Sequence, residues 1–464
     1  MDFIPNIAMN NNYRFLHEKF ISNNNGTTFA ESVTVLMSPT LLIVPSQLIV
    51  YTLLNPSNPK KSPALNYFLI YLVEFACIAL PIITFTTILS NYFAFYFILL
   101  TLLLFIMLSF TSVIDDENIE RLIAIPKRPT ITYFRCIVNV GSAIAILGVD
   151  FKIFPRRFAK TETFGFGVMD AGVGLYIVSN ALTTPVNIMD TNSINMNNFY
   201  KSIKHTVPLI VLGTARVIVL ESLNYQQHIT EYGVHLNFFF ILSIIKFIVP
   251  LTLPFMKPSS LYFYSISLTV MQQMILMYRA QDWVLSNVLR NNFFDANREG
   301  IVSILGYLSL YLGGVAIGLQ FPNKRGAKVR DYMELVLKLG AASVVLGLLT
   351  GYTYSAFGIS RRLTNSCYIL FILLVSVLII ILCLLSEALL INFTKKSSNI
   401  PEIFKAINQY PLLFFILANL LTGIVNLSVN AIYIGPVTSF LILICYMFTL
   451  CSITIGCYVR TRKD

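Results

Sequence analysis

The chain has 464 residues, of which 56% are hydrophobic and 12% charged, and its formal net charge is +11 at pH 7. This apolar composition excludes a water-soluble protein, and the sequence lacks the solvated basic face that a nucleic-acid partner needs. We therefore expect an all-α, polytopic integral membrane protein whose basic excess lies mainly in cytoplasmic connections.

The N-terminal 25 residues are polar and rich in asparagine. They lack the basic start and compact apolar core of a cleavable signal peptide, so the first apolar run is expected to drive insertion. Asn25-Gly26-Thr27 is an acceptor sequence for N-glycosylation that precedes this run. Two further acceptor sequences begin at Asn392 and Asn426, where we expect cytosol and a helix interior. The sequence therefore predicts one glycan, at Asn25.

Apolar runs near the length that crosses a bilayer, about 20 residues, follow one another along the chain. We count thirteen candidate spans, of which the fourth and sixth are short for a full crossing: 33–54, 64–88, 92–111, 134–149, 165–182, 207–220, 236–254, 258–277, 301–320, 331–352, 366–391, 411–430 and 434–458. No repeat of fixed period and no second soluble domain is visible. We expect one multi-helix domain over residues 1–464.

Thirteen crossings that start outside the cytosol place most loop lysines and arginines in cytoplasmic connections, as the positive-inside bias favours. In this arrangement residues 1–32 are lumenal and the tail 459–464 is cytosolic. Two basic clusters, at 152–160 and at Arg361-Arg362, stay on the lumenal side against the trend. A cluster that opposes the bias is a candidate functional site.

The first of these clusters belongs to a short, highly charged segment. Residues 150–162 hold two acids and four bases between two apolar runs. So short a segment stays near the membrane surface, where an unpaired charge is costly. Asp170 follows within the next apolar run, and an intramembrane acid is a functional candidate by default. The nearby glycines, Gly172 and Gly174, suit either close helix packing or ligand contact.

Three more polar groups precede or open later helices. The stretch from Arg216 to Asn237 contains two of the four histidines, which suit proton transfer near neutral pH or can cap a helix. Asn297 and Glu299 are typical of a helix start, as a cap and a dipole-matched acid. The pair Arg361-Arg362 suits phosphate, or contact with lipid headgroups.

In the twelfth predicted helix, Asn419, Thr422 and Asn426 are spaced three and four apart and share one face. They fit interhelical hydrogen bonds or substrate contact equally. The seven cysteines lie inside or at the ends of apolar runs, without metal-ligand spacing to a histidine, and we expect no metal site.

Taken together, these segments resemble one known family. The runs 147–151, 154–162 and 169–174 closely resemble the GPI inositol acyltransferases, which are the phosphatidylinositol-glycan class W proteins and the fungal GPI-anchored wall transfer proteins. The blocks 224–240, 360–363 and 419–426 match the same family in the same order, so the resemblance spans nearly the whole chain. It implies an endoplasmic reticulum membrane enzyme of about thirteen helices.

The resemblance implies transfer of a fatty acyl group, typically palmitoyl, from acyl-CoA to the inositol 2-hydroxyl of glucosaminyl-phosphatidylinositol, early in GPI-anchor assembly. It also implies that Asp150 and Lys160 are the catalytic pair. Such a transfer needs a base for the hydroxyl proton and a positive group for the oxyanion, and these two residues suit the roles. A structural ion pair at a helix end is the alternative. The family includes antifungal targets, with Gly172, Val173 and Gly174 as the inhibitor-contact region.

The remaining polar residues receive supporting roles in this reading. Arg156, Arg157, Arg361 and Arg362 are candidates for substrate phosphate. Secondary polar contacts are expected from Glu162, Asp170, His228, Glu231, His235, Asn237, Asn419 and Asn426. The partners implied are acyl-CoA, glucosaminyl-phosphatidylinositol and membrane lipids, with no cofactor and no obligate protein partner.

Two alternatives stay open. No Gly-x-Ser-x-Gly elbow is present, and His235 with Asn237 is the nearest counterpart of the histidine–asparagine pair of membrane-bound O-acyltransferases. A lipid or small-solute transporter or flippase is the competing class, although transporters commonly show internal repeats.

Overall fold

The computed structural model describes residues 19–20, 22, 24–54, 63–109, 129–184, 196–222, 231–286, 288–321, 329–394 and 400–463. Within these ranges every regular element is a helix, and an isolated β-bridge joins Thr27 to Phe166. The expected all-α class is confirmed for this part of the chain.

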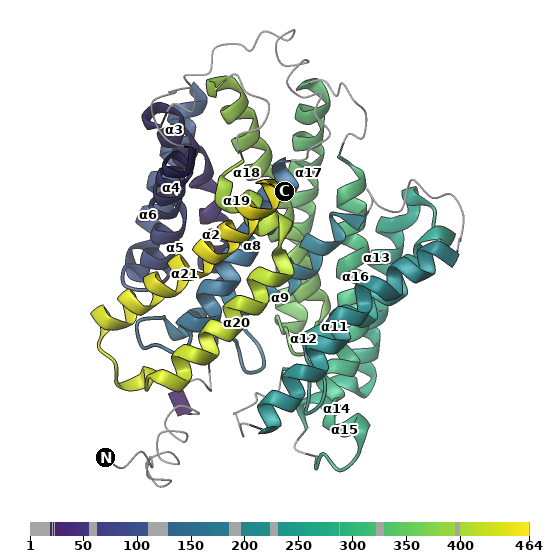
Figure 1. Ribbon diagram of the computed structural model, residues 1–464. Coiled ribbons are helices and arrows are strands. Elements are labelled where there is room, and N and C mark those ends of the chain that lie inside the picture. Colours follow the sequence, from purple (N-terminus) through teal and green to yellow (C-terminus); the bar gives the residue numbers. More distant parts are fainter. Residues whose placement is uncertain are drawn as a thin grey trace, which may run out of the picture.

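The helices follow one another in an irregular bundle (Figure 1). Their bounds are α2 (Phe29–Leu41), α3 (Ile43–Leu53), α4 (Pro63–Glu74), α5 (Leu80–Thr86), α6 (Phe93–Ser109), α8 (Pro129–Gly148), α9 (Val168–Ala181), α11 (Met196–Ser222), α12 (Phe238–Thr252), α13 (Leu261–Ile275), α14 (Gln281–Leu285), α15 (Phe293–Ala296), α16 (Arg298–Leu319), α17 (Val329–Phe357), α18 (Ser366–Thr394), α19 (Glu402–Gln409), α20 (Pro411–Ser428) and α21 (Pro436–Lys463). Single π-helical turns at Phe75–Ala79 and Leu276–Ala280 join α4 to α5 and α13 to α14.

Among the described residues, ten helical segments are long and apolar enough to cross a membrane, and each coincides with a predicted span. They are Phe29–Leu53, Leu65–Thr86, Ser90–Met107, Pro129–Gly148, Phe238–Phe255, Arg298–Leu319, Asp331–Phe357, Ser366–Thr394, Pro411–Ser428 and Pro436–Thr461. The chain is therefore a polytopic membrane protein with about ten candidate spans.

The other three predicted spans fall on apolar helical segments that are shorter than this measure requires. The 165–182 run forms only the 14 residues of α9, because the helix begins at Val168. The 258–277 run forms the 15 residues of α13 before the π-helical turn. The 207–220 run corresponds to an apolar stretch, Thr206–Ile218, within the 27-residue α11.

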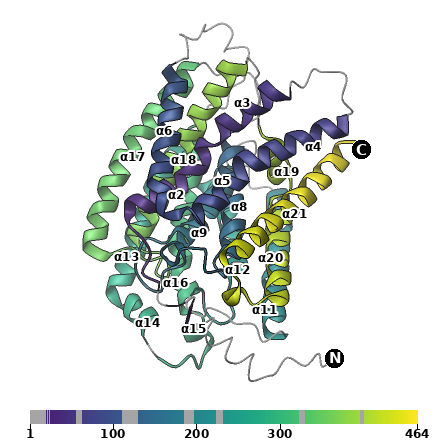
Figure 2. The same ribbon diagram turned by 90° about the vertical axis from the view of Figure 1, so that its left-hand side faces the viewer.

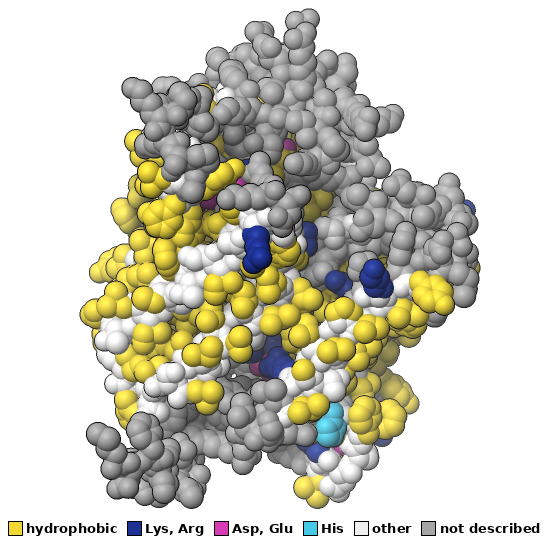
Figure 3. Space-filling view, viewed as in Figure 1, with side chains coloured by type: hydrophobic (Ala, Val, Ile, Leu, Met, Phe, Trp, Pro, Cys, Tyr) yellow, Lys and Arg dark blue, Asp and Glu magenta, His cyan; other side chains and the backbone are white. Residues whose placement is uncertain are grey.

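The centre of the bundle is α18, which packs against α2, α3, α8, α9, α16 and α17 (Figures 1 and 2). It is apolar on all sides, as expected for a helix enclosed by others. Outer helices instead present apolar side chains outward. On α20 and α21 these include the exposed Leu420, Leu427 and Leu441, and hydrophobic side chains cover the middle of the face in Figure 3. This exposed apolar surface suits contact with lipid.

One end of the bundle gathers several connections that are far apart in sequence. Backbone hydrogen bonds join Thr27 N to Phe166 O (2.8 Å), Gly165 N to Ile359 O (2.9 Å) and Val234 N to Ala296 O (2.9 Å). We call this the site end; it comprises 24–28, 87–92, 149–167, 231–237, 288–297 and 358–365, and lies at the bottom of Figure 1. It brings most of the polar groups found in the sequence to one surface.

At the opposite end, two glutamates hold the starts of other helices. Glu387 of α18 accepts hydrogen bonds from Thr130 N (3.2 Å) and Thr130 Oγ1 (2.5 Å) at the first turn of α8. The buried Glu74 accepts from Glu402 N (2.9 Å) and Ile403 N (3.0 Å) at the first turn of α19. Each carboxylate satisfies amide groups that have no partner within their own helix.

The two glycines of α9, Gly172 and Gly174, differ in whether a methyl group would fit in their place. A methyl group at Gly174 would lie 2.7 and 2.8 Å from side-chain carbons of Ile372 on α18, whose branched side chain has little freedom to move. At Gly172 the nearest atom would be Ser142 Oγ, at 3.7 Å. Gly174 is therefore required by packing, whereas Gly172 is not.

We expect Gly174→Ala to lower the free energy of unfolding by about 1–3 kcal/mol through overpacking. Gly172→Ala should be neutral or stabilise the helix by up to about 1 kcal/mol. Thermal unfolding of the two purified variants in one detergent measures the difference. Equal melting temperatures would contradict the packing described here.

Candidate functional site

The charged segment 149–167 forms a loop that Arg156 closes. Arg156 Nη2 donates to the carbonyl oxygens of Val149 (2.7 Å) and Phe154 (3.1 Å), and its guanidinium lies 4.1 Å from the ring centroid of Phe20. Burial lowers the pKa of Arg156 to about 10, and the charge of nearby Asp150 opposes that shift. Arg156 thus binds carbonyl groups at the C-terminal end of α8, where a cation is favoured.

Asp150 lies at this same helix end and is only 8% exposed. Its Oδ2 accepts a hydrogen bond of 2.8 Å from Asn426 Nδ2 of α20. The structure therefore joins the charged segment 150–162 to the polar face of the twelfth predicted helix, through two residues that are 276 positions apart. The amide of Asn426 fixes the carboxylate, and the guanidinium of Arg156 lies near enough to interact with its charge.

Lys160 forms an ion pair with Glu231, which joins the charged segment 150–162 to the polar stretch from Arg216 to Asn237. The Lys160 side chain is 39% exposed and that of Glu231 is 17% exposed. The loop thus carries Lys160 away from α8 and toward the connection that precedes α12. An ammonium held by one carboxylate in a partly open position remains accessible to a ligand.

Asp170 and Arg361 form the most enclosed ion pair of the site. Asp170 Oδ1 accepts from Arg361 Nε at 2.7 Å, and both side chains are 4% exposed. The other carboxylate oxygen accepts from Thr161 N (2.9 Å) and Thr161 Oγ1 (2.7 Å). Although burial opposes the charged guanidinium, Asp170 and Glu231 outweigh it and raise the pKa of Arg361 above its usual range. This pair ties the charged loop to 358–365.

Arg362, the neighbour of Arg361, binds a different acid, Glu299. Arg362 Nη2 donates to Glu299 Oε1 (2.9 Å), and Arg290 binds both oxygens of the same carboxylate (2.6 and 3.0 Å). Asn297, expected to cap α16, makes no side-chain bond to that helix. Its oxygen instead accepts from His235 N (2.8 Å) and Leu236 N (3.0 Å). Through its two arginine partners, Glu299 joins α16 to the segments that carry Arg290 and Arg362. It therefore does more than complement the dipole of its own helix.

Arg157 also holds segments together. Its Nε pairs with Glu31 Oε1 of α2 (3.0 Å), and its Nη2 donates to Ser90 O (3.2 Å) in the turn before α6. Its side chain is 35% exposed. The phosphate role predicted for the four arginines stays a prediction, and the structure shows that each already binds groups of the protein.

The side chains of His235 and Asn237 make unrelated contacts. The exposed His235 stacks on Phe293 with 6.3 Å between ring centroids. Asn237 is buried, accepts from the backbone N–H groups of Phe239 and Phe240 as the cap of α12, and donates to Gly213 O. A capping asparagine has no free amide for catalysis.

The other residues predicted to make secondary polar contacts lie at the surface or are partly buried. Asn419 is exposed and donates to a carbonyl of its own helix, and Glu162 is partly buried, with its backbone N–H bound to Asn24 O. Asn25, the predicted glycosylation site, is exposed. His228 lies outside the described residues.

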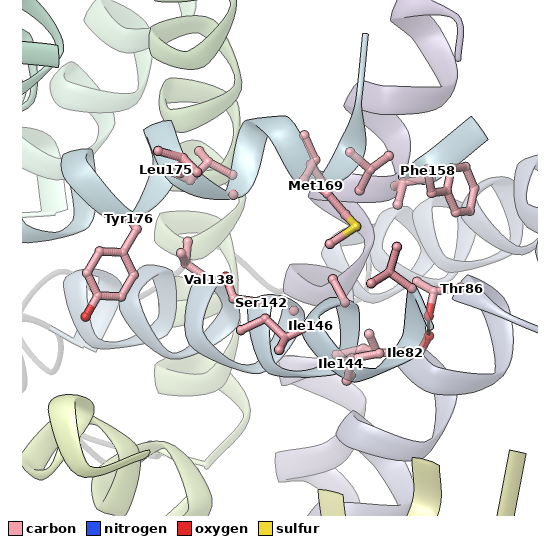
Figure 4. A pocket seen from close by; sticks show the side chains of 18 of the residues that line it. Ile82, Thr86, Val138, Ser142, Ile144, Ile146, Phe158, Met169, Leu175 and Tyr176 are labelled. Atoms are coloured by element: carbon pink, nitrogen blue, oxygen red, sulfur yellow. Dashed lines mark hydrogen bonds between the residues drawn. The ribbon is translucent and has the colours of Figure 1, made fainter. Parts of the chain in front are cut away.

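A cavity of about 290 Å³ lies between α8 and α9 (Figure 4). In Figure 4, Phe158 and Thr86 lie toward one end, Tyr176 lies at the other, and Met169 points between them. The walls are mostly apolar, and the polar lining includes Lys160, Glu231, Tyr232, Arg216 and Asn419. Of the predicted inhibitor-contact residues, Gly172 and Val173 line the cavity. Asp150 directly follows Val149, which also lines it.

Some residues of the site carried no signal in the sequence. Glu31, Thr161 and Arg290 were missed because their roles come from contacts with distant segments. Tyr232, which lines the cavity beside Glu231, looked like an ordinary aromatic residue. It lies in the block 224–240 that resembles the family, but no role was assigned to it from the sequence.

Comparison with known proteins gives the chain its relatives. A family model described as GWT1 matches residues 13–457. A mouse protein named glucosaminyl-phosphatidylinositol-acyltransferase PIGW is 33% identical over 371 residues, which are 70% of this chain and 72% of that protein. The Bos taurus protein of the same name is 30% identical over 502 residues, covering 97% and 98%. GPI-anchored wall transfer protein 1 of Saccharomyces cerevisiae is 33% identical over 367 residues, covering 72% and 74%.

The Asp170–Arg361 pair leads to a prediction about stability. Asp170→Asn leaves a buried guanidinium without its carboxylate and should lower the free energy of unfolding by about 3–5 kcal/mol. Glu334→Gln is the matched control, because it breaks the exposed pair between Glu334 and Lys338 and should cost less than about 0.5 kcal/mol. Melting temperatures of the purified proteins measure both. A small shift for Asp170→Asn would refute the structural role of the pair.

Proposed function

The chain belongs to the GWT1 family, and we propose that it transfers a palmitoyl group from acyl-CoA to the inositol 2-hydroxyl of glucosaminyl-phosphatidylinositol. This is an early step of GPI-anchor biosynthesis, carried out in the endoplasmic reticulum membrane. Support comes from the relatives named glucosaminyl-phosphatidylinositol-acyltransferase, which match most of the chain. The substrates are an acyl thioester and a lipid whose headgroup carries the reacting hydroxyl.

The observation that carries this proposal is the position of the cavity. Its apolar walls, including Ile82, Ile146 and Met169, suit a saturated acyl chain, which gains free energy from burial away from water. Its polar lining includes the Lys160–Glu231 ion pair, and Asp150 lies one residue beyond the wall at Val149. An acyl chain in the cavity can therefore present its thioester to charged groups.

The chemistry needs a base and a positive group beside the thioester carbonyl. Asp150, oriented by Asn426, accepts the inositol hydroxyl proton as the hydroxyl oxygen bonds to the carbonyl carbon. The Lys160 ammonium, positioned by Glu231, stabilises the oxyanion of the tetrahedral intermediate. The carbon–sulfur bond then breaks, and the leaving thiolate takes the proton from Asp150, which regenerates the carboxylate.

The histidine–asparagine alternative receives less support. Asn237 already uses its side-chain oxygen and nitrogen in capping α12 and binding α11. Arg157, whose side chain is 35% exposed, is the favoured contact for the substrate's phosphate. Arg361 and Arg362 are enclosed in ion pairs, which supports a structural role for them.

We further propose thirteen membrane-embedded helices, with the N-terminal segment lumenal and the C-terminus cytosolic. Support comes from the site end, where hydrogen bonds link 24–28, 87–92, 149–167, 231–237, 288–297 and 358–365. Chain segments that return to one end are separated by an even number of crossings. Because the span Phe238–Phe255 crosses once, α13 must cross back to the site end. α9 and the 27-residue α11 lie between two site-end segments, and we propose that both cross.

Replacing Asp150, the proposed base, tests the mechanism. Asp150→Asn should lower kcat about 10²–10⁴-fold and leave the KM for both substrates nearly unchanged. Lys152→Gln, an exposed residue of the same loop, is the control and should retain full activity. Formation of acylated glucosaminyl-phosphatidylinositol from labelled palmitoyl-CoA measures both. Full activity of folded Asp150→Asn would remove Asp150 from the mechanism, and no product from folded wild-type protein would favour a transporter.

The proposed orientation predicts a single glycan. Asn25→Gln should abolish the mass shift that glycosidase treatment produces, because Asn25 is exposed at the lumenal site end. Asn392→Gln should leave the shift intact, since Asn392 lies at the cytosolic end of α18. A shift that depends on Asn392 would reverse the orientation.

A further inference from the structure

Within the described residues, one acidic side chain lines the cavity, at the end that carries the charged loop. The charged lining residues are the basic Lys160 and Arg216 and the acidic Glu231. The Glu231 side chain is 17% exposed and forms an ion pair with Lys160. Figure 3 shows basic and acidic side chains together in a hollow in the lower half of the face. Glu231 is therefore within reach of a ligand.

The segment that carries Glu231 is held against the start of α16. The carbonyl oxygen of Tyr232, the next residue, accepts a hydrogen bond from Gly300 N at 3.0 Å. Gly233 follows with φ +109°, and a methyl group there would lie 2.5 Å from Ala296 O. A side chain on so closely packed a backbone is placed precisely. The fold thus directs the Glu231 carboxylate to the cavity independently of its ion pair.

The positive groups of the protein do not account for the charge of Glu231. A carboxylate beside the Lys160 ammonium offsets part of the positive charge that the proposed mechanism uses for the oxyanion. A neutral side-chain amide would hold the ammonium with a smaller loss. Arg361 also interacts with Glu231, but it already has Asp170 as its ion-pair partner. A further positive group that binds from outside explains the acid better.

The proposed acceptor supplies such a group. Its glucosamine ring carries a primary amine, and amino groups of this kind are mainly protonated near pH 7. A carboxylate has two oxygens with about four acceptor positions, so Glu231 can bind Lys160 and a second ammonium together. Asp150 is unsuited to this contact. An ammonium bound to Asp150 would stabilise the charged carboxylate and weaken it as the proposed base.

We propose that Glu231 binds the ammonium group of the acceptor's glucosamine and so favours this acceptor over neutral analogues. The inference rests on the proposed acyltransferase function and adds to it a residue that determines acceptor specificity. Because Glu231 contacts Lys160, a glucosamine bound there brings the attached inositol ring to the catalytic loop. A carboxylate shared by two ammonium groups also holds Lys160 less tightly, which leaves more of its charge for the oxyanion.

The test compares two acceptors that differ in one group. They are glucosaminyl-phosphatidylinositol and glucosyl-phosphatidylinositol, in which a hydroxyl replaces the amine. In purified wild-type protein the KM for the glucosyl acceptor should be higher by about tenfold or more, the loss expected for one charge-assisted hydrogen bond. Glu231→Gln keeps the shape of the side chain and removes its charge. It should raise the KM for the glucosaminyl acceptor about tenfold and leave the KM for the glucosyl acceptor nearly unchanged.

Three further variants separate recognition of the acceptor from positioning of Lys160. Glu231→Asp retains the charge and should retain the preference for the amine. Lys160→Met should lower kcat with both acceptors and leave the preference intact or increase it. Asp282→Asn is the control, because Asp282 is an exposed acid of α14 away from the cavity. It should change neither kcat nor KM.

The outcomes distinguish this role from the alternatives. Equal KM values of the wild-type protein for the two acceptors would overturn the proposal. It would also be overturned if Glu231→Gln lowered kcat with both acceptors by the same factor and kept the difference in KM, since Glu231 would then act only through Lys160. Absence of product from the wild-type protein with either acceptor would instead refute the proposed function.

Discussion

The ion pair between Asp170 and Arg361 is the interaction on which the rest of the site depends. It joins segments 191 positions apart, and both side chains are enclosed. Asp170 lies in the first turn of α9, where the helix dipole favours a negative charge, and Thr161 supplies two further hydrogen bonds. A buried charge is stable only with such partners. The pair therefore dictates how the charged loop meets the remainder of the bundle.

Once that loop is fixed, the other charges fall into two groups. Arg361 is paired with Asp170, and Arg362 is paired with Glu299; these enclosed pairs hold segments together. Lys160 and Glu231 are more open and line the cavity. Asp150 is buried yet held by a neutral amide. The structure thus separates a partly open ion pair at the cavity from enclosed ion pairs that hold segments together.

The same contrast distinguishes the two ends of the bundle. At the end opposite the site, the carboxylates of Glu387 and Glu74 accept hydrogen bonds from the first turns of α8 and α19, so these two acids hold helix starts in place. The charges of the site end instead include a partly open pair at the cavity, Lys160 and Glu231.

The sequence by itself determined the helical membrane class, ten of the spans and the segments that hold the site, because hydropathy and charges within apolar runs are local properties. It also singled out Asp150, Lys160, Glu231 and Asn426. It could not assign their partners, since Lys160 meets Glu231 across 71 positions and Asp150 meets Asn426 across 276. Nor could it show that Arg361 is enclosed or that Asn237 is a cap. Those facts depend on which helices pack side by side, and only the tertiary structure decides that.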